Sequence, residues 1–198
     1  MRNVVCLGDS TTYGYMITRK KVWPSILNNK FAEEGKDINI INKGINGDTT
    51  SGMIARFERD CLNENADLLI LMGGVNDIFM FQNIDKIKDN IKLIVETSNK
   101  NNVDIILFTP IPFIKEIFTF FEADNLDLFE NTLKEYVSWI NEYTKENNIK
   151  SIDVYNMFMN NIFKSNKYED IYFDGVHLSE NGHNIFALEL YKELGKYL

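Results

Sequence analysis

The sequence predicts an α/β fold, a three-layer α/β/α sandwich built around a five-stranded parallel sheet. Two observations lead to this prediction. Short, mostly apolar segments alternate with longer amphipathic ones along the chain, and the short segments are almost continuously apolar. Continuous apolar runs suit strands that are covered on both faces, as parallel strands usually are. Five such strand–helix units, joined by right-handed crossovers, place helices on both faces of one sheet.

The expected strands are short, apolar and partly β-branched. They span Val4–Leu7, Ile38–Ile41, Leu68–Met72, Ile105–Phe108 and Ile152–Tyr155. The longer segments predict helices over Pro24–Glu34, Thr50–Asn63, Ile84–Asn99, Leu126–Glu146 and Glu180–Tyr197. Pro24 suits the first turn of a helix, where its missing N–H costs nothing, and Gly35 suits a helix end.

One segment, Pro110–Asp127, fits neither pattern. It contains two prolines and a dense set of isoleucine and phenylalanine residues, and it is too long for a plain connection. We expect a loop with a short helix that overhangs the sheet.

Length and composition narrow the class of protein. The 198 residues, 44% of them hydrophobic, fit a single domain over residues 1–198 with a sizeable core. The net charge of −8 argues against nucleic acid or an anionic membrane surface as a main partner. The sequence shows no apolar run of the length that a signal peptide or an integral membrane segment needs. We therefore expect a cytoplasmic protein.

The two cysteines, Cys6 and Cys61, lie far apart and have no metal-ligand spacing. Two buried, reduced thiols are expected. A nucleophilic Cys6 is the alternative, but this residue lies inside the first strand rather than at its end.

Polar turns follow several of the expected strands. They contain Gly8-Asp9-Ser10, Asn42 to Thr50, Gly73 to Asp77 and, beyond a short helical piece, Phe173 to Ser179. Ligands of open parallel sheets bind outside the carboxyl ends of the strands, so the four turns should meet at one rim. Each turn alone could be an ordinary one, because Gly, Asp and Ser are common in turns for backbone reasons. Their convergence is the stronger argument for a functional site.

The side chains in these turns include the parts of an acyl-transfer site. Ser10 is a candidate nucleophile, which needs a base and a group that orients the base. His177 follows Asp174 by three residues, a spacing at which a carboxylate can fix the imidazole. Gly47 and Asn76 could donate hydrogen bonds into the cleft. Gly44 and Gly47 could instead provide positive φ angles, Asn76 an Asx turn, and Asp174 with His177 an exposed loop pair.

The four turns together resemble the blocks of the SGNH (GDSL-type) hydrolase superfamily, in particular its small bacterial thioesterase/lysophospholipase-like acylhydrolases. The similarity runs from residue 4 to about residue 187, in the family's order. It implies a flavodoxin-like fold and no cofactor or metal. The residues it assigns to catalysis are Ser10, Asp174 and His177, and those it assigns to the oxyanion hole are Ser10, Gly47 and Asn76. The first block reads Gly-Asp-Ser-Thr, so Thr11 stands where the family has leucine.

Other residues at the rim receive structural roles. His183 is expected at a helix start, and Asp9 and Asp77 are expected to brace the loops through backbone N–H groups. Asp77 is the alternative triad acid. Thr11 should line the substrate pocket, together with Phe118 and Phe121, whose segment could instead serve core or dimer packing.

The resemblance implies a serine esterase or thioesterase that cleaves small to medium acyl substrates through an acyl-enzyme on Ser10. A carbohydrate O-deacetylase on the same fold is one alternative. An inactive flavodoxin-like binding module is another, although such a module has no need for both Ser10 and His177. A homodimer is left open. The motif is not a Gly-x-Ser-x-Gly nucleophile elbow, which excludes the larger α/β-hydrolase fold.

Overall fold

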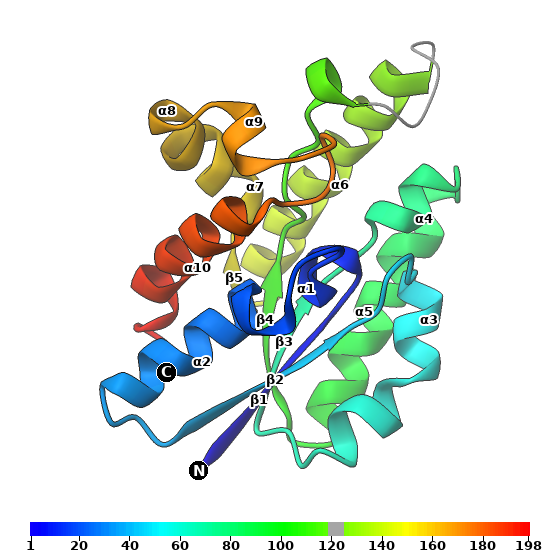
Figure 1. Ribbon diagram of the computed structural model, residues 1–198. Helices are drawn as coiled ribbons and strands as arrows, with labels where there is room; N and C mark the ends of the chain where they lie inside the picture. The colour runs from blue at the N-terminus through cyan, green and yellow to red at the C-terminus, as the bar shows by residue number, and fades with distance from the viewer. Residues whose placement is uncertain (119–124) are drawn as a thin grey trace.

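The computed structural model describes residues 1–118 and 125–198, and its five strands form one parallel sheet (Figure 1). The strands are β1 (Arg2–Gly8), β2 (Ile38–Gly44), β3 (Leu68–Met72), β4 (Asp104–Phe108) and β5 (Lys150–Ile152). Their order is β2-β1-β3-β4-β5, with parallel pairing throughout. The chain leaves β1 for β2 on one side and crosses to β3 on the other. Loops that diverge in this way leave a crevice beyond the carboxyl end of β1.

Helices cover both faces of the sheet, as the sequence predicts. One face packs against α2 (Trp23–Glu33) and α10 (Glu180–Leu194), and the other against α3 (Thr50–Ala55), α5 (Ile84–Lys100) and α6 (Leu126–Glu146). Alternate strand residues enter the two cores: Val4 and Cys6 belong to the first, Val5 and Leu7 to the second. This double burial explains why the strands are continuously apolar.

Short elements surround the long ones, mostly near the rim where the strands end. They are α1 (Ser10–Tyr13), η1 (Arg19–Lys21), η2 (Glu58–Leu62), α4 (Val75–Phe79), η3 (Lys115–Ile117), α7 (Val154–Met157), η5 (Phe158–Ile162), α8 (Phe163–Ser165) and α9 (Tyr168–Ile171). Two of them, α1 and α4, begin inside the expected polar turns after β1 and β3. Short helical turns therefore carry Ser10 and Asn76.

Several predicted boundaries are wrong. The second strand continues to Gly44, three residues beyond its predicted end at Ile41. The fifth strand ends at Ile152, because the Asp153 side chain accepts the Asn156 N–H and starts α7, which takes up Val154 and Tyr155. The predicted helix over residues 50–63 is divided into α3 and the π-helix η2. The last helix ends at Leu194, with Gly195 after it, rather than at residue 197.

The irregular segment contains the short helix η3, but residues 119–124 lie outside the described part, and so does the predicted pocket residue Phe121.

Cys6 and Cys61 are both free and buried. Burial raises the pKa of both thiols, that of Cys61 to about 12, which argues against Cys6 as a nucleophile. Within the described residues, no helix combines the length and apolarity needed to cross a bilayer.

Candidate active site

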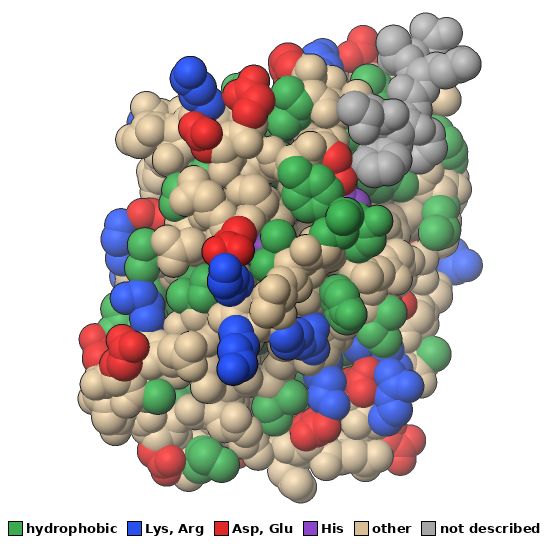
Figure 2. Space-filling model, in the orientation of Figure 1, with side chains coloured by type: hydrophobic (Ala, Val, Ile, Leu, Met, Phe, Trp, Pro, Cys, Tyr) green, Lys and Arg blue, Asp and Glu red, His purple; other side chains and the backbone are tan. Residues whose placement is uncertain are grey.

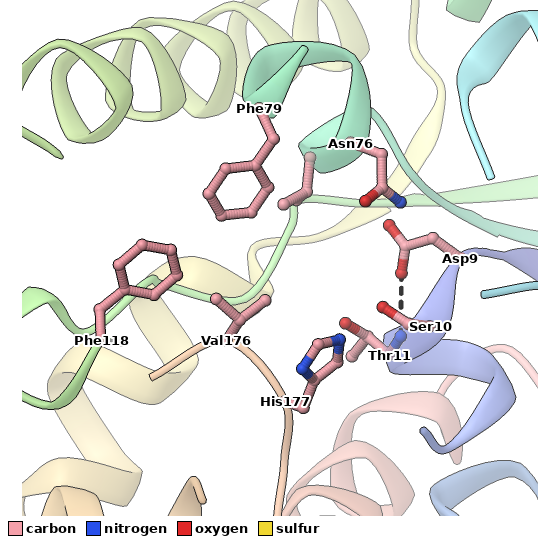
Figure 3. A pocket seen from close by; sticks show the side chains of 9 residues that line it. Asp9, Ser10, Thr11, Asn76, Phe79, Phe118, Val176 and His177 are labelled. Carbon is pink, nitrogen blue, oxygen red and sulfur yellow. Dashed lines mark hydrogen bonds between the residues drawn. The ribbon is translucent and has the colours of Figure 1, made fainter. Parts of the chain in front are cut away.

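Three of the side chains predicted for catalysis and the oxyanion hole, Ser10, Asn76 and His177, line one cavity of about 230 Å³ at the rim (Figure 3). Ser10 begins α1 directly after β1, Asn76 lies in α4 after β3, and His177 lies in the loop before α10. The cavity has a polar side, formed by Asp9, Ser10, Thr11, Asn76 and His177. The sheet topology thus brings together residues that are up to 167 positions apart in the sequence.

The turn that carries Ser10 is held from both sides. The Asp9 carboxylate accepts the Thr11 N–H at 2.9 Å, which caps α1, and the Trp23 indole donates to the Thr11 carbonyl at 3.1 Å. Asp9 therefore braces the turn through a backbone N–H, as expected. Burial raises the pKa of its carboxyl to about 6.

The Asp174 side chain organises the histidine loop. One of its oxygens lies 2.6 Å from His177 Nδ1, and the other accepts the N–H groups of Val176 and His177 at 2.9 and 2.7 Å. Asp174 is only 5% exposed, so the expectation of an exposed loop pair is wrong. With its Nδ1 proton held by the carboxylate, a neutral imidazole presents Nε2 as a proton acceptor.

Aromatic rings flank the same imidazole. The ring centroid of Tyr15 lies 4.4 Å from that of His177, and the Phe173 ring stacks at 5.8 Å. This contact was not predicted, because Tyr15 belongs to none of the sequence motifs.

Ser10 and His177 face the same cavity without being hydrogen-bonded to each other. No hydrogen bond among the described residues joins Ser10 Oγ to the His177 ring. Catalytic hydrogen bonds are often long in the unliganded state and tighten when substrate binds. The arrangement is therefore compatible with proton transfer between the two.

The Asn76 amide is fixed by the loop that contains Gly47. Asn76 Nδ2 donates one hydrogen bond to the Asp48 carbonyl at 2.9 Å, and its second N–H has no hydrogen-bond partner among the described residues. Gly47 does not line the cavity itself but lies directly before Asp48. Its φ is +71°, and an added Cβ would meet nothing within 4 Å, so the backbone conformation explains the glycine there.

Gly44 has a different explanation from the expected positive φ. A Cβ at this position would lie 2.1 Å from the Tyr13 backbone nitrogen. Gly44 therefore allows β2 to approach α1 closely.

Two further titratable residues of the predicted rim, Asp77 and His183, make buried hydrogen bonds to neighbouring segments. Asp77 is fully buried, and its two oxygens accept hydrogen bonds from the Thr50 N–H and hydroxyl at 2.9 and 2.6 Å. It braces two loops, as expected, and no hydrogen bond within the described residues joins it to His177. His183 Nδ1 accepts the Trp23 N–H at 3.4 Å, and burial lowers the pKa of its imidazole to about 4. Ser179 caps the helix that carries it.

The other side of the cavity is apolar. It is formed by Val75, Phe79, Phe118 and Val176. Thr11 and Phe118 thus line the cavity, as predicted. Three of the lining residues were not predicted: Val75, Phe79 and Val176. Val75 and Phe79 share one face of α4 because they are four positions apart, a signal that is hidden when this segment is taken for a turn.

A serine hydroxyl, a carboxylate-bound imidazole and a fixed amide around one cavity define the class of hydrolases that transfer acyl groups to serine. Sequence comparison agrees with this class. The profile of the GDSL-like lipase/acylhydrolase family matches residues 6–185. The chain belongs to this family, which confirms the resemblance drawn from its motifs.

Individual relatives point in the same direction. The chain is 27% identical to an acetylxylan esterase of Geobacillus stearothermophilus over 168 residues, 80% of this chain and 73% of the esterase. It is 38% identical to an arylesterase of Vibrio mimicus over 74 residues, which cover only 37% of either protein. The crystal structure of a lipase/acylhydrolase from Enterococcus faecalis superposes with a TM-score of 0.81 at 23% identity, covering all of this chain and 97% of the other. This last similarity confirms the fold.

Proposed function

We propose that this protein is a serine esterase whose nucleophile is Ser10 and whose general base is His177. The observation that carries the proposal is the bond between the buried Asp174 carboxylate and His177 Nδ1, beside the cavity that Ser10 lines. A carboxylate held on one nitrogen leaves the other nitrogen to work as a base.

The reaction proceeds in two halves. As Ser10 Oγ bonds to the acyl carbon, its proton passes to His177 Nε2. When the bond to the leaving alcohol or thiol breaks, the same proton moves to the leaving group, and the acyl group stays on Ser10. A water molecule then attacks the acyl-enzyme, gives its proton to His177, and releases the carboxylic acid while Ser10 Oγ recovers a proton.

Three donors serve the oxyanion: the N–H groups of Ser10 and Gly47 and the free N–H of the Asn76 amide. Donors of this kind stabilise charge as it develops in the transition state. The support for Asn76 is its place on the cavity wall and its fixed orientation.

The substrate is an ester or thioester with a small to medium acyl group, which the apolar side of the cavity receives. A cavity of about 230 Å³ suits a short chain better than a long one. Exposed hydrophobic residues on rim elements include Tyr13, Met16 and Phe173, and Figure 2 shows several hydrophobic side chains close together near the middle of this face. They favour an apolar leaving group over the charged glycerophosphate group of a lysophospholipid.

A carbohydrate O-deacetylase is the second candidate. The acetylxylan esterase that matches 80% of this chain and the limited cavity volume both favour it.

Two finer expectations concern location and assembly. Cell fractionation tests whether the protein is cytoplasmic, and light scattering tests whether it forms a homodimer.

The test is a panel of p-nitrophenyl esters of graded acyl length, with acyl-CoA and acetylated xylo-oligosaccharides beside them. We expect hydrolysis of the short p-nitrophenyl esters. Ser10→Ala should lower turnover by a factor on the order of 10⁶, because the nucleophile is removed. A folded Ser10→Ala protein that keeps more than a few per cent of the activity would refute the proposal. Preference for the acetylated sugars over all other esters would select the second candidate.

Acyl length is tested at the apolar wall. Phe79 stacks on Phe129, with centroids 3.9 Å apart, and on Phe118 at 5.9 Å. Phe79→Ala and Phe118→Ala should enlarge the cavity and shift the preferred acyl chain to greater length. Phe163→Ala, in a separate aromatic contact on α8, is the matched control and should change stability alone. Unchanged chain preference in both wall variants would show that these rings serve core packing.

A further inference from the structure

Arg56 is a buried arginine that no motif of the sequence points to. It follows the last residue of α3 and is only 7% exposed. Its Nη groups donate to the carbonyls of Gly8 and Lys43 at 3.0 and 2.7 Å. The same guanidinium donates to the carboxylates of Asp48 and Asp60 at 2.7 and 2.8 Å.

These partners lie in the segments that present the proposed oxyanion donors. Gly8 ends β1 two residues before Ser10. Lys43 and Asp48 stand on either side of the turn that contains Gly47. The carbonyl of Asp48 in turn accepts the Asn76 amide. One planar group is therefore tied directly to two of the donor turns and, through Asp48, to the third.

We propose that Arg56 is the positioning residue of the oxyanion hole, which sets the distances among the donors on Ser10, Gly47 and Asn76. The inference rests on the proposed esterase function. A guanidinium has five N–H donors in a fixed plane, so it can hold two carbonyls and two carboxylates at set angles. Lysine has the same charge but only a single donor atom on a flexible chain. Burying such a charge is costly, which makes a role in geometry a better explanation than stability alone.

Arg59 provides a matched control on the neighbouring turn. It also pairs with Asp60, at 2.8 Å, but its side chain is 65% exposed. Among the described residues its hydrogen bonds reach only Asp60. Loss of Arg59 therefore removes an ion pair of the same cluster without touching the donor turns.

The experiment compares Arg56→Lys, Arg56→Ala and Arg59→Ala in three measurements. Hydrolysis of p-nitrophenyl acetate gives kcat and KM across pH. Inhibition by an aryl trifluoromethyl ketone, which adds to a serine oxygen and leaves a charged oxygen in the hole, gives Ki. Thermal melting shows the temperature range in which each variant is folded.

For Arg56→Lys we expect kcat to fall at least tenfold and Ki to rise by a similar factor, with KM within threefold. The pH of half-maximal kcat should not move, because the base is untouched. For Arg56→Ala the loss should reach about 10²–10³, that of a missing oxyanion donor, and added methylguanidinium should restore part of it. Arg59→Ala should stay within twofold of wild type.

A purely structural Arg56 would give a different pattern. Arg56→Lys would then melt at a lower temperature, yet its kcat and Ki would stay within twofold of wild type at temperatures where both proteins are folded. This result would overturn the inference. If Arg56→Ala does not fold, Arg56→Lys and Asp48→Asn are judged by the same criteria. Asp48→Asn weakens the bond to Arg56 Nε but keeps an oxygen at that position. Failure of the esterase proposal looks different again, because wild type itself would then neither hydrolyse the ester nor bind the ketone.

Discussion

The two sides of the cavity entrance are held in place by different means. The donor side, with Ser10, Gly47 and Asn76, is tied to the body of the protein by the buried groups of Arg56 and Asp77. The histidine side is mostly self-contained: Asp174 accepts three bonds from within its own loop, and the Phe173 N–H donates to the His177 carbonyl. One hydrogen bond to the segment after β4 is donated by the Ile114 N–H to the Gly175 carbonyl at 2.9 Å, and another by the Tyr172 hydroxyl to the Pro112 carbonyl at 2.8 Å.

The difference matches the two tasks. Donors that stabilise developing charge work best when they need not move during the reaction. A base must instead reach Ser10 Oγ first and the leaving group afterwards. A loop that fixes the tautomer and ring orientation locally, without rigid ties to the donor side, suits that second task.

The largest difference expected between the two sides is in the loss of kcat when the buried acid of each, Asp174 or Asp77, is replaced. Asp174→Asn should lower kcat by about 10⁴, because the amide favours the wrong imidazole tautomer. Asp77→Asn should instead lower stability, since it weakens the two bonds to Thr50. Steady-state kinetics at matched folded fraction, checked by circular dichroism, distinguishes them. A greater loss of kcat in Asp77→Asn would make Asp77 the triad acid.

A smaller effect is expected on the donor side. Asn76→Ala should reduce kcat by about 10²–10³, equivalent to ~2.7–4 kcal/mol of transition-state stabilisation. KM should change little, because the lost bond forms mainly in the transition state. If kcat were unchanged while the protein melted at a lower temperature, Asn76 would be no more than a brace for Asp48.

The smallest effect concerns stability. The folded pKa of Asp9 is about 6, above its ordinary value of 3.8, so the folded state binds this proton more tightly than the unfolded state. The stability that the protonated Asp9 contributes is therefore fully present below about pH 4 and is lost as the pH rises through 6. Asp9→Asn keeps an oxygen for the Thr11 N–H and should gain up to about 3 kcal/mol at pH 7 relative to wild type.

Denaturant unfolding of Asp9→Asn and wild type between pH 4 and 7 measures this difference. Burial lowers the pKa of His183 to about 4, so its contribution to stability changes with pH in the opposite direction. That contribution is lost as the pH falls from about 6.5 through 4. It is present in both proteins, so its effect cancels in the comparison. Parallel curves would mean that Asp9 titrates at its ordinary pKa.

The sequence predicted the sheet and several polar side chains that meet at its rim, because each depends on local patterns. Apolar runs locate the strands, α6 has the predicted bounds, and the motifs name Ser10, Asn76 and His177. The fifth strand was misplaced because Val154 and Tyr155 are β-formers that a cap at Asp153 draws into a helix. Arg56 and Tyr15 were missed since their roles come from contacts between distant segments, which no local pattern records.

Labelling by a fluorophosphonate probe, followed by peptide mass spectrometry, tests the central claim most directly. Wild type should carry the probe on Ser10 alone, because only an activated serine reacts at a useful rate. His177→Ala should react orders of magnitude more slowly, while His183→Asn, folded at neutral pH, should react like wild type. An unlabelled wild type, a label on another residue, or undiminished labelling in His177→Ala would contradict the account.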